Sequence, residues 1–100
     1  MSADLIARFG RRFVQTARER MATVPPLDGT PIEAARKLAL QLHSISGEAA
    51  MIGFRELSQL ARDVMRLARD VESGAVGPGE CAAAVEELGR ALDELERTLP

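Results

Sequence analysis

Apolar residues recur at spacings of three and four positions along four stretches of the chain, which is the pattern of amphipathic helices. The first stretch runs from about Ala3 to Met21, and a break at residues 23–30 follows it. That break holds two prolines and a glycine, residues that commonly end helices. The predicted core face of the first helix is Ile6, Phe9, Phe13, Ala17 and Met21.

The second stretch opens at Thr30-Pro31-Ile32-Glu33 and ends at Gly53. Thr30 and Glu33 have the spacing of a capping box, and Pro31 suits the first helical position. The third stretch starts near Arg55, so the connection is short enough to make the two helices antiparallel neighbours. The predicted core faces are Ala35, Leu38, Leu42, Ile45, Ala49 and Ile52 in the second helix, and Leu57, Leu60, Val64, Leu67 and Val71 in the third.

A glycine-rich break at residues 73–79 precedes the fourth stretch, which runs from about Glu80 to Leu99. Its inward positions are Val85, Leu88, Leu92, Leu95 and Leu99, and Gly89 is expected to mark a close helix contact. Four such helices with short connections predict an all-α fold, an antiparallel four-helix bundle. This leaves room for a short accessory helical segment at the N-terminal end. We expect residues 1–100 to form one domain.

Composition narrows the class of protein. The chain of 100 residues is 46% apolar and 28% charged, as in ordinary folded proteins. Its net charge of −2 and its lack of Trp and Tyr argue against nucleic-acid and membrane-surface binding. The single cysteine, Cys81, excludes an intrachain disulfide and fits a reduced setting. With neither a long apolar run nor a signal-peptide pattern, we expect a cytoplasmic protein.

Few reactive side chains are available, and His43 is the most informative of them. The chain holds one histidine, so no His pair exists for a metal site, and Gly77-Pro78-Gly79 lacks the lysine of a P-loop. His43 lies one step outside the predicted seam through Leu42 and Ile45 and therefore faces solvent. It shares an outer stripe with Arg36, Leu40, Gly47 and Ala50.

Two interpretations of this stripe are open. A lone helical histidine is often a surface residue without a role. Gly47, however, sits in mid-helix, where glycine costs about 1 kcal/mol relative to alanine. Close approach of a partner to His43 would offset that cost, and tight helix packing is the other explanation. Leu40 and Ala50, with Met51, would form a shallow apolar docking face around the imidazole.

The segment from His43 to Phe54, HSISGEAAMIGF, resembles the signature H-x-[LI]-K-G-x-x-x-x-x-G of histidine-containing phosphotransfer (HPt) domains. It is most similar to the phosphotransfer domain of chemotaxis-type histidine kinases, where Gly-Phe also closes the motif. The resemblance implies that His43 exchanges a phosphoryl group with the aspartate of a response-regulator receiver domain. Histidine suits this step because it titrates near neutrality. The implied protein is a phosphoryl carrier without an ATP site or cofactor, and its partner supplies Mg²⁺.

Ser46 departs from the signature, because the family usually has Lys at this position to neutralise the phosphoryl group. Ser46 can donate a hydrogen bond but supplies no charge. Arginines of the third helix could compensate, with Met65 facing His43 and Arg62 and Arg69 one turn to either side. They could equally form a solvated face paired with acidic neighbours. The predicted partner-binding residues are Leu40, Ser46, Gly47, Ala50, Arg62, Arg66 and Arg69.

Three other functions compete with a phosphoryl carrier. A bundle that binds a receiver or histidine kinase without accepting phosphate is favoured by Ser46. A dimerisation helix pair of a histidine kinase would have an acidic residue and then a proline after its histidine, whereas Ser44 follows His43 here. A purely structural bundle leaves Gly47 unexplained. Oligomeric state discriminates, because a phosphotransfer bundle is expected to be a monomer and a kinase pair a dimer.

Overall fold

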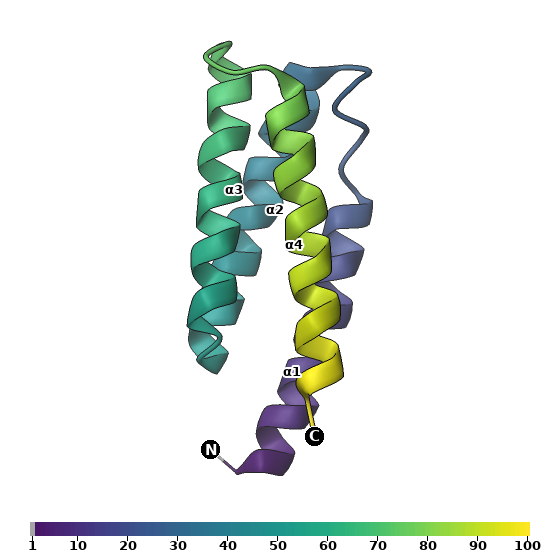
Figure 1. Cartoon of the computed structure of the whole chain (residues 1–100), viewed down its shortest axis with the longest axis vertical. Coiled ribbons are helices and arrows are strands. Elements are labelled where there is room, and N and C mark those ends of the chain that lie inside the picture. Colours follow the sequence, from purple (N-terminus) through teal and green to yellow (C-terminus); the bar gives the residue numbers. More distant parts are fainter. Residues whose placement is uncertain (1) are drawn as a thin grey trace.

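Four helices that alternate in direction account for most of the chain. The computed structural model describes residues 2–100 and contains α1 (Ala3–Ala22), α2 (Pro31–Ile52), α3 (Arg55–Ser73) and α4 (Pro78–Thr98). They run side by side as an elongated antiparallel bundle with both ends of the chain at the same end of the molecule (Figure 1). The predicted all-α four-helix bundle is confirmed. No accessory helix precedes α1 among residues 2–100.

Glycines end the two helices that lead into the tight connections. Gly53 caps α2 with φ of 97°, and Gly74 caps α3 with φ of 82°. Side chains with a Cβ rarely adopt this left-handed conformation, whereas glycine does so without strain. The Gly53 amide donates to the carbonyl oxygens of Ala49 and Ala50, which closes the last turn of α2. The chain therefore reverses within two residues, and α2 and α3 pair more extensively than any other two helices.

The predicted capping box at the start of α2 is wrong. Thr30 is the residue before the helix, as expected, but its side chain makes no capping hydrogen bond. Glu33 instead lies 3.7 Å from the ammonium group of Lys37 as an i,i+4 ion pair. Pro31 does occupy the first turn and has no amide hydrogen that needs a partner. The proline thus leaves one amide fewer to be paired at a helix end that has no side-chain cap.

The core lies along the bundle axis, but its centre on α3 differs from the prediction. Ala61 and Ala68 are fully buried, whereas Leu60 and Leu67 are only half-buried at the edge of the core. Small side chains at the centre let α2 and α3 approach closely, and the leucines then cover the flanks. The 3-4 spacing identifies the apolar face of a helix, but it does not show which residues of that face lie at the centre of the core and which lie at its edge.

Two further core predictions need correction. Phe9 is 45% exposed, because it lines an open surface groove with Met51 and Ile52 at the end of α2 and does not enter the core. Gly89 is exposed, and a Cβ at this position would meet no atom within 4 Å, so it marks no close helix contact. The close contact is at Gly10 on α1, where an added Cβ would lie 2.8 Å from a methyl group of Leu99.

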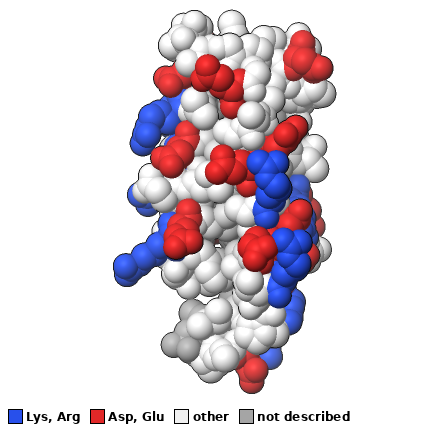
Figure 2. Space-filling model, in the orientation of Figure 1, with Lys and Arg blue, Asp and Glu red and all other residues white. Residues whose placement is uncertain are grey.

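Charged side chains of both signs are interleaved along the face of the bundle formed by α3 and α4 (Figure 2). Ion pairs from Arg18 to Asp93 (2.5 Å) and to Glu96 (2.9 Å) connect α1 with α4. Among residues 2–100, none of the helices combines the length and the apolar content that a membrane span requires.

Candidate functional site

His43 lies near the middle of α2 on its solvent-exposed face. Its neighbour Leu42 has no exposed surface, and Ile45 is 1% exposed, so both point into the core. Consecutive helical residues are about 100° apart around the axis, so burial of these two side chains directs the imidazole outward. The predicted position of His43, one step off the seam, is confirmed.

The imidazole borders a shallow groove of about 490 Å³ between α2 and α3. The groove is lined by Arg36, Ala39, Leu40 and His43 from α2 and by Arg69 and Glu72 from α3. Helical side chains lean toward the N-terminus of their own helix, and α2 and α3 run in opposite directions. His43 and Arg69 therefore lean toward each other along the bundle axis, and both line this groove.

Charge in the groove is predominantly positive. Arg36 Nε donates a hydrogen bond to Glu72 Oε1 at 3.2 Å, which joins α2 to α3 at the rim. Arg69 forms no ion pair with any of residues 2–100. Its guanidinium group therefore remains available to an anion that enters the groove beside His43.

The α2 surface around His43 is small and apolar. Leu40 is 67% exposed and Met51 is 85% exposed, and Gly47 and Ala50 are exposed between them. A Cβ added at Gly47 would meet no atom of the chain within 4 Å. Tight helix packing therefore does not explain this glycine. These side chains leave the imidazole accessible to a large partner.

Ser46, which the sequence predicts to contact a partner, lies in the interface between α2 and α3. It is 5% exposed, and its hydroxyl donates to the carbonyl oxygen of His43 at 2.9 Å. Its own carbonyl oxygen accepts from the Ser58 hydroxyl, also at 2.9 Å, across the α2–α3 interface. A lysine at this position could extend its stem out of the interface to solvent, but a serine side chain is too short. The Ser46 hydroxyl is thus engaged inside the helix pair, and its contact with a partner stays a prediction.

The arginines of α3 do not act as one group. Only Arg69 lines the groove with His43. Arg66 lies 3.6 Å from the Asp63 carboxylate, in the manner of a solvated helix face, and Arg62 is exposed outside the groove. Met65 is half-buried against the core.

Glu72 was missed in the sequence, and Arg36 appeared there only as part of the outer stripe. A signal for this pairing was present, because the two residues lie almost equally far from the Gly53–Phe54 turn in an antiparallel helix pair. Counting outward from that turn places them side by side. Both residues lie outside the HPt-like segment, so the motif gave no indication that they are close to His43.

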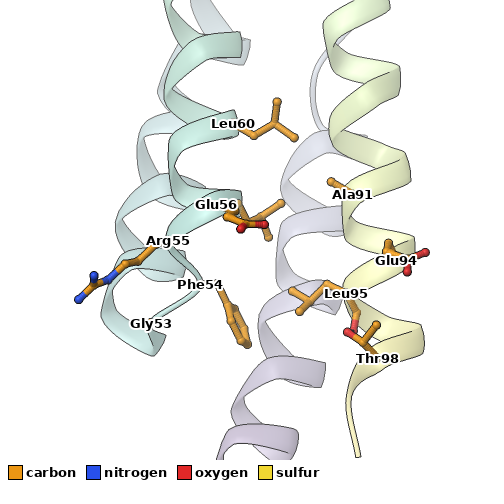
Figure 3. A pocket seen from close by; sticks show the side chains of 10 residues that line it. Gly53, Phe54, Arg55, Glu56, Leu60, Ala91, Glu94, Leu95 and Thr98 are labelled. Carbon is orange, nitrogen blue, oxygen red and sulfur yellow. The ribbon is translucent and has the colours of Figure 1, made fainter.

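A second groove lies apart from His43, between the start of α3 and the end of α4. Its volume is about 580 Å³, and Leu60, Phe54 and Leu95 point into the gap, while Arg55 points away (Figure 3). None of its lining residues borders the groove at His43. Residues 2–100 contain no cluster of three or more His, Cys, Asp or Glu side chains that could hold a metal ion.

Comparison with protein families shows a match to the model of the Hpt domain over residues 9–98. This match spans all of α2, α3 and α4 and most of α1. Neither the curated proteins nor the solved structures provide a significant match.

Proposed function

We propose a function for this chain, which belongs to the family of Hpt domains. Domains of this family serve histidine phosphotransfer in phosphorelays and interact with receiver domains and histidine kinases. We infer that residues 1–100 act as one such domain, as a monomer in the cytoplasm. In this proposal His43 accepts a phosphoryl group from the aspartate of a receiver domain and returns it in the reverse step.

The observation that carries the proposal is the placement of His43. It is the only histidine of the chain, and it is exposed beside a groove that holds the guanidinium groups of Arg36 and Arg69. To form a phosphohistidine, the imidazole must reach the phosphorus as a nucleophile. The product then carries about two added negative charges, which nearby cations stabilise. An accessible imidazole next to cationic groups meets both needs, nucleophilic attack and charge neutralisation.

In the proposed step, an imidazole nitrogen of His43 attacks the phosphorus of the aspartyl phosphate in line. A P–N bond forms as the P–O bond to the aspartate breaks, and the aspartate leaves as a carboxylate. The other ring nitrogen then gives its proton to solvent, so the ring ends neutral and the phosphoryl group carries about two negative charges. Such a transfer gains little from covalent chemistry by the protein, so positioning and charge stabilisation dominate. The receiver domain supplies Mg²⁺.

The surroundings of His43 have distinct roles in this proposal. Arg69 approaches the transferred phosphoryl group and replaces the charge of the absent lysine. Leu40, Gly47 and Ala50 form the surface on which the receiver domain docks, and Gly47 lets its active site approach the imidazole. Arg62 and Arg66, which lie outside the groove, contribute long-range attraction to an acidic partner.

Phosphoryl transfer from a labelled receiver domain tests the proposal directly. A receiver domain charged with labelled phosphate is mixed with the wild-type chain and with His43→Gln. We expect acid-labile, base-stable label on the wild type alone, and equal helicity of both proteins by circular dichroism. Label on the His43→Gln variant would contradict the assignment of His43.

A docking bundle that accepts no phosphate is the second candidate, and the serine at position 46 favours it. It predicts binding to a receiver domain without any label on the wild-type chain. Light scattering adds a separate test, because a monomer fits either candidate, whereas a stable dimer would favour a dimerisation helix pair of a kinase.

A further inference from the structure

One carboxylate stands in the groove into which the proposed phosphoryl group would extend. Among residues 2–100, Glu72 is the only acidic residue that lines it, and its side chain is 34% exposed, against 65% for Arg36. The Glu72 carboxylate therefore lies at the wall of the groove, and the Arg36 guanidinium reaches it from the solvent side. An anion beside a phosphate-accepting group is unexpected, because like charges repel.

The charges of the groove show what this carboxylate does. With a neutral imidazole, Arg36 and Arg69 supply two positive charges and Glu72 one negative charge, which leaves one net positive charge. A phosphoryl group adds about two negative charges. The phosphorylated groove then carries about one excess negative charge, whereas without Glu72 it would be nearly neutral.

The ion pair at the rim has a second effect. Arg36 Nε already donates to Glu72 Oε1 at 3.2 Å. To contact a phosphoryl group, this guanidinium group must either leave the Glu72 carboxylate or bind both anions at once. Glu72 therefore opposes phosphorylation both through its own charge and by retaining Arg36. Both effects favour the state in which the phosphoryl group has left His43.

We propose that Glu72 sets the phosphoryl equilibrium of His43, as a positioning residue that keeps the phosphohistidine high in energy and ready to pass its phosphoryl group on. This inference rests on the proposed phosphoryl transfer to His43. The reaction remains the exchange between aspartyl phosphate and imidazole, with the P–N bond formed as the P–O bond breaks. Glu72 contacts neither reacting atom and changes only the relative stability of the two phosphorylated states.

The test measures the equilibrium between a phosphorylated receiver domain and the full chain, as the fraction of label on each. For Glu72→Gln we expect a shift of about three- to tenfold toward the phosphorylated chain, because one groove charge is removed. The shift should shrink in about 0.5 M salt, where charges a few ångströms apart are screened. Arg36→Gln, which removes a positive charge from the same groove, should shift the equilibrium the other way.

Asp63→Asn is the matched control, since it removes the same charge from α3 outside the groove. Its equilibrium should stay within about twofold of the wild type. A Glu72→Gln equilibrium equal to that of Asp63→Asn, or a shift insensitive to salt, would overturn the role of Glu72. Complete absence of label on the wild type would instead overturn the proposed function itself.

Discussion

Substitution of Gly47 should change the stability of the fold and the rate of phosphoryl transfer in opposite directions. It lies within α2, is exposed, and has open space where a Cβ would go. Gly47→Ala should therefore stabilise the fold by about 0.5–1 kcal/mol, because alanine loses less backbone entropy in a helix. If a receiver domain docks over Gly47, the same methyl group should slow phosphoryl transfer. Urea denaturation and the single-turnover transfer rate measure the two effects.

Gly89 provides the matched control on α4. It is also exposed within a helix, with no atom within 4 Å of an added Cβ, but it lies on a different helix from His43. Gly89→Ala should give a similar gain in the free energy of unfolding and leave the transfer rate unchanged. Equal effects of both variants on transfer would show that Gly47 has no special role.

Ser46 and Arg69 allow a second comparison at the residue scale. The Ser46 hydroxyl is directed at a backbone carbonyl group, whereas the Arg69 guanidinium borders the groove with His43. Arg69→Gln should slow transfer by about three- to tenfold, because it removes a charge that stabilises the transferred phosphoryl group. Ser46→Ala should change the rate by less than about twofold. Transfer rates from a phosphorylated receiver domain measure both.

Arg62→Gln is the control for this comparison, since it removes the same charge from the same helix outside the groove. A small effect is expected for it. If Arg62→Gln slows transfer as strongly as Arg69→Gln, general attraction between the proteins accounts for both results.

At the scale of the helix, α2 separates a structural face from a binding face. Leu42 has no exposed surface, whereas Leu40, two residues earlier, is 67% exposed. Leu42→Ala should lower the free energy of unfolding by about 2–5 kcal/mol, because it leaves a cavity among packed helices. Leu40→Ala should cost less than about 0.5 kcal/mol. Denaturant unfolding measures these costs, and similar values for both variants would contradict the assigned faces.

Local sequence signals predicted the helices well. Pro31 and the glycines at 53 and 74 place helix ends through their own backbone preferences, which act over a few residues. The periodicity of α2 likewise placed His43 outside the seam. These features need no knowledge of distant parts of the chain.

Contacts between distant segments were the part that could not be predicted. The close approach of Leu99 to Gly10 joins opposite ends of the sequence, and no local pattern indicates it. The burial of Ser46 depends on how α3 rotates to present Ala61 rather than Leu60 to the core. Glu72 likewise lies near His43 because α2 and α3 pair, and no sequence motif indicates this position.

At the scale of the whole molecule, Cys81 couples stability to pH. Burial raises the pKa of the Cys81 thiol, because the thiolate is poorly solvated in the core. An acid whose pKa is raised by folding stabilises the fold fully below its unfolded value and loses this contribution as pH rises toward the folded value. Stability should therefore fall above about pH 9, the ordinary pKa of a thiol.

Urea denaturation at pH 7 and near pH 10 measures this loss. Cys81→Ala should lose less stability between the two pH values than the wild type. The chain has no tyrosine and a single lysine, so few other groups titrate in this window. An equal loss in both proteins would show that Cys81 is not the responsible group.

The two-residue turn at Gly53 and Phe54 also has a kinetic consequence. It joins the most extensively paired helices through contacts that are close in sequence, and such contacts form quickly because little loop entropy is lost. The α2–α3 hairpin should therefore assemble early in folding, and its amides should exchange with deuterium most slowly in the native state. The imidazole of His43 would then sit on the most persistent part of the molecule, and α1 could fray without disturbing it.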